Sequence, residues 1–261
     1  MVSSTMWCSS RWRFIAGSPH LFSVYVNDLI FELRHSGSGT YIGKLFTGCV
    51  VYADDIVLLS PSCRGLQNLV SVCEHYGLKW DIKFNPSKSQ ASMFGGTNPS
   101  DMCINLAITA VQWTNKVKYL GLHFFSNSGH TEVSDNIRKF YGQYNNIRSV
   151  LGYGSREMCT VHLCKVFCLP TLMHGCESWR MQDKQQNRIS VAWNNSFRSI
   201  FNCFWCESVS PLQYFCQVLL VNYLIHQRKL LYWNKLFTSD NCILLFLSRL
   251  VSQRFVAIGS L

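Results

Sequence analysis

The sequence contains no long apolar run and no secretory signal. A membrane-spanning helix needs about 18 or more consecutive apolar residues, and the two most apolar stretches, residues 216–225 and 242–251, are both too short. The amino-terminal residues lack an apolar stretch that ends in a small-residue cleavage site. We therefore expect an intracellular protein, nuclear or cytoplasmic rather than secreted, that is not embedded in a membrane.

Several common catalytic patterns are also missing. The chain has no glycine-rich phosphate loop, and no Ser or Cys stands out as a nucleophile with His and Asp partners. Charged residues make up only 15% of the chain, whereas hydrophobic residues make up 48%. This composition excludes a disordered chain and is typical of a protein with a packed core.

The cysteines do not form a disulfide framework. There are 13 of them, an odd number without regular spacing, so we interpret them as reduced thiols. Cys203 and Cys206 have the two-residue spacing of a zinc half-site, with Cys216 and His226 downstream as possible partners. A second cysteine pair with matching spacing is absent, which favours core packing over zinc binding.

Acidic residues are few relative to basic ones. The chain has 24 Lys and Arg against 14 Asp and Glu, which gives a formal net charge of +10. A surplus of this size favours a polyanionic partner, either nucleic acid or an anionic membrane face. An ordinary basic surface explains the charge equally well, so composition alone leaves the choice open.

Hydrophobic periodicity predicts an α+β part followed by an all-helical part. We expect strands at residues 41–46, 49–52, 56–59, 81–84, 89–94, 104–108 and 117–122, and helices at residues 21–33, 61–77, 133–151, 158–168, 192–201, 212–225 and 230–237. Pro61 should open its helix and Gly77 should end it, while Pro170 should stop the helix before it. The domains are predicted at residues 1–128 and 129–261.

Basic and aromatic side chains alternate along the helical part. Arg138, Lys139 and Arg148 lie near Tyr141 and Trp193, among other residues of both kinds. Such a mixture can follow a nucleic-acid backbone and stack on bases. Amphipathic helices with solvated charges are the alternative interpretation, and the two are not exclusive.

An acidic tetrapeptide, Tyr52-Ala53-Asp54-Asp55, lies between two strongly strand-forming segments. Because only a tight turn separates these strands, we expect a hairpin with the carboxylates at its tip. Adjacent anions between apolar strands are costly to desolvate unless a cation lies beside them. Carboxylate oxygens suit Mg²⁺, so the tip is a candidate metal site, with a solvated Asp-Asp turn as the alternative.

This tetrapeptide and its neighbours resemble the reverse transcriptases of non-LTR (LINE-type) retrotransposons. Segments similar to that family follow one another in the family's order at residues 17–29, 52–55, 84–89, 117–121, 169–179, 193–198 and 228–233. The resemblance implies part of a palm, an antiparallel sheet with helices, followed by an all-helical thumb. It also implies RNA-directed DNA polymerase activity, in which two metal ions drive transfer of dNMP to a primer 3′ end.

The resemblance assigns catalytic roles to three residues. Asp54 would bind a divalent cation, Mg²⁺ or Mn²⁺, and Asp55 would support it as a second metal-binding carboxylate. Lys88 would lie near the triphosphate of the dNTP and could donate a proton to the leaving pyrophosphate. Without the resemblance, Lys88 is an ordinary solvated lysine that follows a turn.

Five further residues would contact the nucleotide and the nucleic acid. Gly17 and Ser18 would lie beside the incoming nucleotide, where a small residue lets template and base approach closely. Tyr119, Leu120 and Gly121 would support the end of the DNA primer on the RNA template. Taken without the resemblance, this second segment is a strand that a glycine ends.

The 16 residues before Gly17 depart from the family pattern. The family carries another catalytic aspartate in an earlier strand, together with a basic subdomain, the fingers, that grips the triphosphate. The 16 residues before Gly17 contain no Asp or Glu. Two-metal catalysis needs carboxylates that bridge both ions, so we expect the chain to be inactive by itself. The alternatives are a catalytically dead nucleic-acid-binding module, or a non-functional relic whose sheet lacks its first strands.

Overall fold

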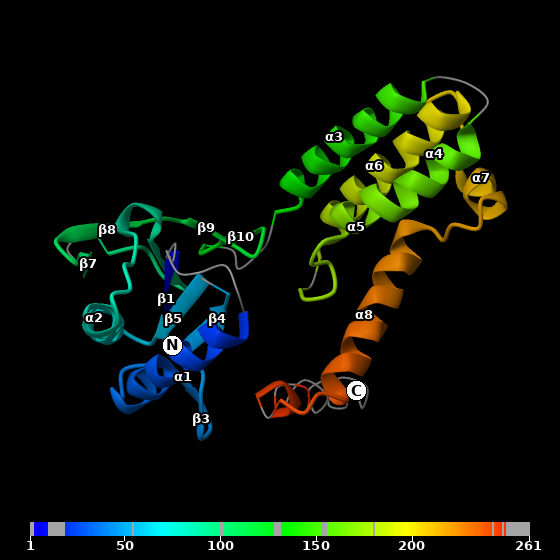
Figure 1. The fold of residues 1–261 in the computed structure, drawn as a ribbon. Coiled ribbons are helices and arrows are strands. Elements are labelled where there is room, and N and C mark those ends of the chain that lie inside the picture. Colours follow the sequence, from blue (N-terminus) through cyan, green and yellow to red (C-terminus); the bar gives the residue numbers. More distant parts are fainter. Residues whose placement is uncertain are drawn as a thin grey trace. The chain divides into compact units, whose positions relative to one another are not determined.

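The structure is a computed structural model that describes residues 3–9, 19–53, 55–99, 102–127, 132–152, 156–179, 181–241, 243–246 and 248, with side chains from residue 26 onward. The chain divides into two compact units, Met1–His130 and Thr131–Leu261 (Figure 1). This division lies close to the domain boundary predicted after residue 128.

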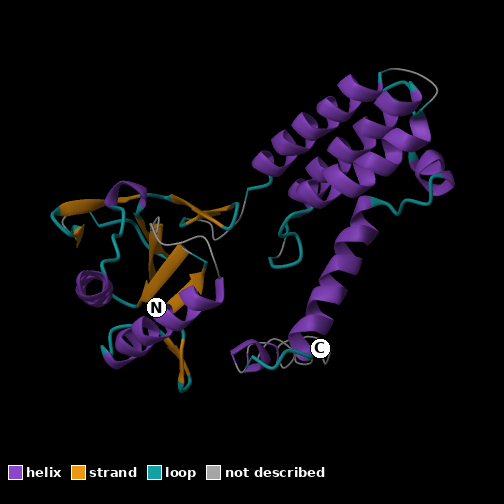
Figure 2. Cartoon of the chain, viewed as in Figure 1, coloured by secondary structure: helices purple, strands orange, loops and turns teal. Residues whose placement is uncertain are grey.

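The first unit combines short strands with two long helices (Figure 2). Its described elements are β1 Ser3–Ser9, α1 Pro19–His35, β2 Tyr41–Ile42, β3 Leu45–Phe46, β4 Cys49–Tyr52, β5 Asp55–Ser60, α2 Cys63–Trp80, the 3₁₀ turn η1 Pro86–Lys88, β6 Gln90–Phe94, β7 Ile104–Leu106, β8 Thr109–Trp113, β9 Lys116–Tyr119 and β10 Leu122–Phe125. Together with the helical second unit, this arrangement confirms the predicted α+β class.

Within the described residues, the main sheet has six strands in the order β4-β5-β1-β6-β8-β7. Neighbouring strands are antiparallel except β6 and β8, which run parallel. The pairs β2-β3 and β9-β10 form separate two-stranded ribbons. The sheet therefore places the β4-β5 hairpin at one edge and the β7-β8 hairpin at the other.

The first strand, β1, lies in the middle of this sheet. It pairs with β5 from Ser4 opposite Ser60 to Ser9 opposite Asp55, and with β6 on its other side. Residues 1–16 showed little pattern, and no strand was predicted there. The structure places β1 in this segment, where it joins the acidic hairpin to the rest of the sheet.

Helix α2 covers the sheet and begins and ends differently from the prediction. Ser62, not Pro61, precedes its first turn, and the Ser62 hydroxyl accepts a backbone hydrogen bond there. Gly77 lies inside the helix, where a Cβ atom would come 2.6 Å from the backbone oxygen of Ile82. The helix continues to Trp80, and the next residue, Asp81, adopts the left-handed conformation with a φ of 52°.

The later strands also differ from the prediction. Residues 81–84 form no strand, because the chain leaves α2 through the left-handed turn at Asp81. Residues 104–108 do not form one strand, since the chain reverses at Ala107, with a φ of 54°, and returns as β8. Residues 117–122 likewise belong to two strands, β9 and β10. In each case a residue other than glycine adopts a positive φ in the turn: Asp81, Ala107 and Leu120.

The described part of the second unit consists of helices. In chain order they are α3 Ser134–Leu151, α4 Glu157–Leu163, the π-helical turn η2 Cys164–Cys168, α5 Leu169–Leu172, α6 Asp183–Phe201, α7 Ser210–Phe215 and α8 Val221–Phe237. The predicted helix at residues 212–225 is therefore divided between α7 and α8. The core surrounds Trp193, whose ring centroid lies 6.1 Å from that of Phe140 and 5.3 Å from that of Phe197.

Pro170 does not stop the helix before it. The π-helical turn widens the backbone just ahead of α5, and Leu169 N–H donates to the carbonyl of Cys164, five residues back. Pro170 then occupies the first turn of α5, a position where proline removes no needed hydrogen bond. The prediction failed because a π-helical turn lets a proline follow without a helix end.

Candidate functional site

The acidic tetrapeptide forms the predicted hairpin. β4 and β5 pair in antiparallel register, with Tyr52 opposite Asp55. Ala53 lies in the turn with a φ of 50°, in the left-handed region. Asp54 itself lies outside the described residues. The hairpin is held by the apolar side chains of β5, where Ile56 and Leu58 are almost fully buried in the core of the first unit.

The strand β1 ends beside this hairpin. Ser9 is the register partner of Asp55 in the antiparallel pair of β1 and β5. A residue at position 9 is therefore close to Asp55 across the sheet. The sequence did not point to Ser9, because residues 3–9 lack the alternation that identifies a strand.

Tyr119 and Asp55 lie near each other, although many residues separate them in the sequence. Burial raises the pKa of the Tyr119 phenol above its usual value, and the negative charge of Asp55 raises it further. Cys49 and Tyr52 of the β4 strand also raise the pKa of this phenol, by electrostatic repulsion. The structure therefore brings the predicted primer-support segment next to the acidic hairpin.

The residues after Tyr119 make a tight turn rather than continuing a strand. Leu120 and Gly121 have φ angles of 47° and 84°, and Leu122 then pairs back onto Tyr119. Two consecutive positive φ angles are typical of a type I′ hairpin turn. Tyr119 thus lies at the end of β9, with Leu120 partly exposed at the tip of the β9-β10 ribbon.

Lys88 lies at the end of a short 3₁₀ turn, η1. The Asn85 side chain caps this turn by accepting from the backbone N–H of Ser87 at 3.1 Å. The turn packs beside β1 and β8, and the Lys88 side chain is exposed. Its proposed contact with a triphosphate therefore stays a prediction. Gly17 and Ser18 lie outside the described residues, so their predicted contact with the nucleotide stays a prediction.

The acidic hairpin fits a divalent cation in part. The Asp55 carboxylate is half-buried, and its oxygens are hard ligands of the kind that Mg²⁺ and Mn²⁺ take. However, no three His, Cys, Asp or Glu side chains gather into a metal site anywhere in the described part of the chain. The type of ligand suits the ion, but the described ligands are too few to hold it by themselves.

The basic residues of α3 fall into two groups. Arg138 is 78% exposed and pairs with Asp135 at 3.0 Å, and Lys139 is also exposed. Arg148 is only 7% exposed, and its Nη2 donates to the Ser199 backbone oxygen at 3.4 Å. The sequence predicted all three as backbone contacts, but Arg148 does not belong to the exposed basic face.

The cysteine pair of the predicted zinc half-site lies in the loop after α6. Cys203 is partly buried, and its thiol contacts the Phe201 backbone oxygen at 3.7 Å. Cys206 is exposed. Neither belongs to a group of three metal-binding side chains among the residues that the structure covers. Within the same residues, no helix is long and apolar enough to cross a membrane.

Comparison with known sequences identifies the first unit. Residues 15–124 match the family described as reverse transcriptase (RNA-dependent DNA polymerase). This part of the chain belongs to the reverse transcriptase family. The matched residues include the acidic hairpin, the 3₁₀ turn with Lys88 and the β9-β10 ribbon. The first unit is therefore part of a reverse transcriptase palm, as the sequence predicted.

A curated relative extends the similarity beyond the palm. The chain is 27% identical over 199 residues to a protein of Drosophila melanogaster named "Probable RNA-directed DNA polymerase from transposon BS". The similarity covers 71% of this chain and 21% of the relative. The chain thus spans about a fifth of the length of the curated protein that it matches. The predicted retrotransposon origin is supported, and the LINE type is compatible with it.

Proposed function

We propose that this chain supplies the palm hairpin of an RNA-directed DNA polymerase encoded by a non-LTR retrotransposon. The observation that carries the proposal is the Tyr52–Asp55 turn between β4 and β5, inside the segment that matches the reverse transcriptase family. The proposed partners are an RNA template, a DNA primer and dNTPs. The proposed place of action is inside the cell, where the template is found.

In this proposal Asp54 and Asp55 hold Mg²⁺ or Mn²⁺. When bound, the ions would promote attack of the primer 3′ hydroxyl on the dNTP and stabilise the charge on the leaving pyrophosphate. Tyr119 remains a neutral phenol beside Asp55, because both burial and the carboxylate oppose its ionisation.

We further propose that the 261-residue chain does not polymerise by itself. Two-metal phosphoryl transfer uses carboxylates that bridge both ions, but the register partner of Asp55 is Ser9, which offers only a hydroxyl. A single acidic hairpin would then hold the metal weakly and leave the attacking hydroxyl without full activation. Loss of one acidic ligand is expected to remove most of the catalytic rate.

Primer extension tests this proposal directly. The chain is mixed with an RNA template, an annealed DNA primer, dNTPs and either Mg²⁺ or Mn²⁺, and product length is read on a sequencing gel. We expect no extension above that of a sample without protein. Robust extension that disappears in Asp54→Ala would overturn the proposed inactivity and would establish the hairpin as a working metal site.

A second candidate function is nucleic-acid binding by the helical unit. It is favoured by the net charge of +10 and by the exposed Arg138 and Lys139 on α3. The test is binding of an RNA–DNA duplex at several salt concentrations. The double variant Arg138→Gln/Lys139→Gln should bind more weakly, and a double variant of two exposed first-unit residues, Lys44→Gln/Arg64→Gln, serves as the charge-matched control. Absence of binding at low salt would exclude this function.

A further inference from the structure

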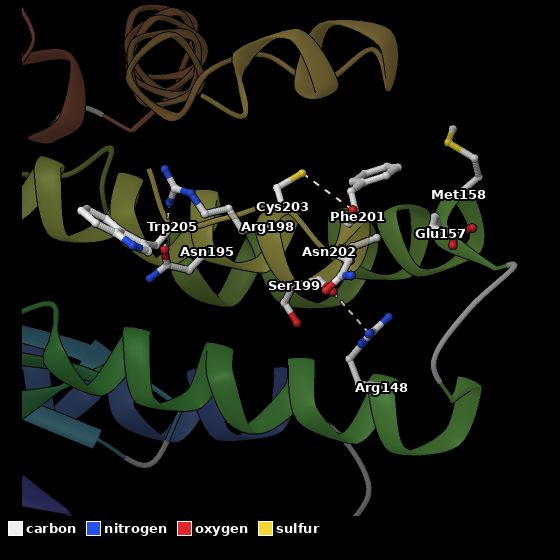
Figure 3. Close-up of a pocket in the computed structure, with 11 residues that line it drawn as sticks. Arg148, Glu157, Met158, Asn195, Arg198, Ser199, Phe201, Asn202, Cys203 and Trp205 are labelled. Atoms are coloured by element: carbon white, nitrogen blue, oxygen red, sulfur yellow. Dashed lines mark hydrogen bonds between the residues drawn. The ribbon is translucent and has the colours of Figure 1, made fainter. Parts of the chain in front are cut away.

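The second unit contains a cavity that the palm chemistry does not use. Its volume is about 980 Å³, and it lies among the end of α3, the start of α4, the end of α6 and the loop after α6 (Figure 3). Ligand sites commonly have volumes of roughly 300–1,000 Å³, so this cavity is large enough for a nucleotide.

Two arginines give the cavity its charge. Arg148 reaches toward α6 from α3, and Arg198 lies on α6 itself (Figure 3). Glu157 is the carboxylate among the lining residues, so the lining has two guanidinium groups against one carboxylate. The balance favours an anionic ligand. The first-unit hairpin, in contrast, is acidic.

Arg198 is held in place but keeps N–H groups for a ligand. Its Nη1 donates to Asn195 Oδ1 at 2.9 Å, and its Nε and Nη2 donate to the Glu207 backbone oxygen at 3.3 and 3.2 Å. These bonds use three of the five N–H groups of a guanidinium. Since these acceptors are neutral oxygens, they do not neutralise the positive charge of the guanidinium, which can still attract an anion.

Trp205 adds an aromatic surface beside these arginines. Its side chain is 86% exposed although it lines the cavity, whereas Trp193 of the core is fully buried. The loop that carries Trp205 is well braced. Glu207 N–H donates to the Phe204 oxygen at 3.1 Å, and Phe204 N–H donates to the Glu207 carboxylate at 3.0 Å. An exposed indole on a braced loop offers a flat face for stacking.

We propose that this cavity binds a nucleobase together with its phosphate, with Trp205 stacking on the base and Arg198 facing the phosphate. Asn195 and Asn202 also line the cavity and supply amide groups suited to base edges. Stacking with little sequence preference, next to arginines, is how proteins hold single strands. The proposal deepens the nucleic-acid-binding function proposed above and does not depend on the acidic hairpin.

The test uses fluorescence anisotropy of the full chain with labelled single-stranded oligonucleotides, (dT)8 and (rA)8. We expect Trp205→Ala to weaken binding by about 5- to 150-fold, the usual contribution of one aromatic–base stack. Because Trp205 is exposed, this variant should fold normally. Tyr214→Ala, which removes an aromatic side chain that is 79% exposed outside the cavity, is the matched control and should bind like the parent chain.

A second measurement separates a phosphate contact from a merely structural role. Arg198→Gln should reduce the slope of log affinity against log salt by about 0.7, the value for one phosphate of a single strand. Arg64→Gln, in the first unit, should leave the slope unchanged. Equal effects of Trp205→Ala and Tyr214→Ala, or an unchanged slope in Arg198→Gln, would overturn the proposal.

Competition identifies the source of the bound group. If free dTMP and AMP displace the oligonucleotides at millimolar concentration, the cavity accepts a single nucleotide. If only oligonucleotides compete, the base and phosphate must belong to a strand. Either result supports the proposed chemistry, provided that Trp205→Ala weakens the binding that is displaced. If oligonucleotide binding does not depend on this cavity, the proposal for the palm hairpin still stands, because primer extension tests the first unit and not the second.

Discussion

The Asp55 carboxylate raises the pKa of the Tyr119 phenol, although Asp55 lies in the main sheet of the first unit and Tyr119 in the β9-β10 ribbon. Burial of Tyr119 is the larger cause, and the carboxylate adds to it. This pairing links the acidic hairpin to the β9-β10 turn. It also gives a spectroscopic way to detect the geometry of the hairpin without any catalytic assay.

The first prediction concerns this pair. Asp55→Asn removes a negative charge near Tyr119, so the pKa of the phenol should fall but remain above its usual value because burial persists. Difference absorbance titration against the same background carrying Tyr119→Phe isolates this one phenol. Asp135→Asn, in the second unit, should leave the titration unchanged. An unchanged Tyr119 titration in Asp55→Asn would contradict the contact.

The second prediction concerns the register between β1 and β5. Ser9→Asp places a carboxylate opposite Asp55, and two opposed carboxylates favour a divalent cation. Mn²⁺ affinity, measured by isothermal titration calorimetry, should rise by at least about 10-fold, equivalent to about 1.4 kcal/mol. Thr109→Asp adds the same charge at an exposed position of β8 and should not raise the affinity. Equal Mn²⁺ affinity in Ser9→Asp and the parent would argue against this register.

The third prediction contrasts two helical glycines. In Gly77→Ala the new Cβ would lie 2.6 Å from the Ile82 backbone oxygen, so α2 or the following loop must shift, at a cost of roughly 1–3 kcal/mol. In Gly142→Ala, within α3, the new Cβ meets nothing within 4 Å. The higher helix propensity of alanine should therefore stabilise the folded protein by about 0.5–1 kcal/mol. Chemical denaturation gives both values. If both substitutions changed the free energy of unfolding in the same direction, the close packing at Gly77 would be contradicted.

The fourth prediction concerns pH. Burial raises the pKa of Cys49 from 9.0 to about 12, so the folded state holds this proton more tightly than the unfolded state. The resulting stability is fully present below about pH 9 and is lost as the pH rises toward 12. At most roughly 4 kcal/mol depends on this group. Under reducing conditions, Cys49→Ala should flatten the fall in unfolding free energy between these pH values, whereas Cys103→Ala, at an exposed site, should not.

The sequence predicted the parts of the fold in which local pattern and tertiary structure agree. β4 and β5 are strongly strand-forming on both sides of a short turn, and they pair as expected. The long helices α1, α3 and α6 also follow their apolar spacing, although α6 begins earlier than predicted. Agreement of this kind arises because burial of one face and local propensity select the same structure.

The failures occur where a single residue adopts an unusual conformation. Ala107 and Leu120 turn the chain with positive φ, which residues with a Cβ rarely adopt, so no turn was predicted at either place. Pro170 follows a π-helical turn that leaves no mark in the sequence. For the candidate site, Asp55 was placed correctly on the hairpin. Ser9 and Trp205 were not singled out, because their positions depend on distant parts of the chain.

The central position of β1 has a consequence for synthesis of the protein. A central strand that is made before both of its neighbours has no partner until β5 and β6 have been made. During that interval its backbone hydrogen-bonding groups are open to other chains. Production of this protein should therefore respond strongly to chaperones and to translation speed, and a short deletion within residues 3–9 should reduce the yield of folded protein more than a deletion of equal length in the exposed loop at 204–208.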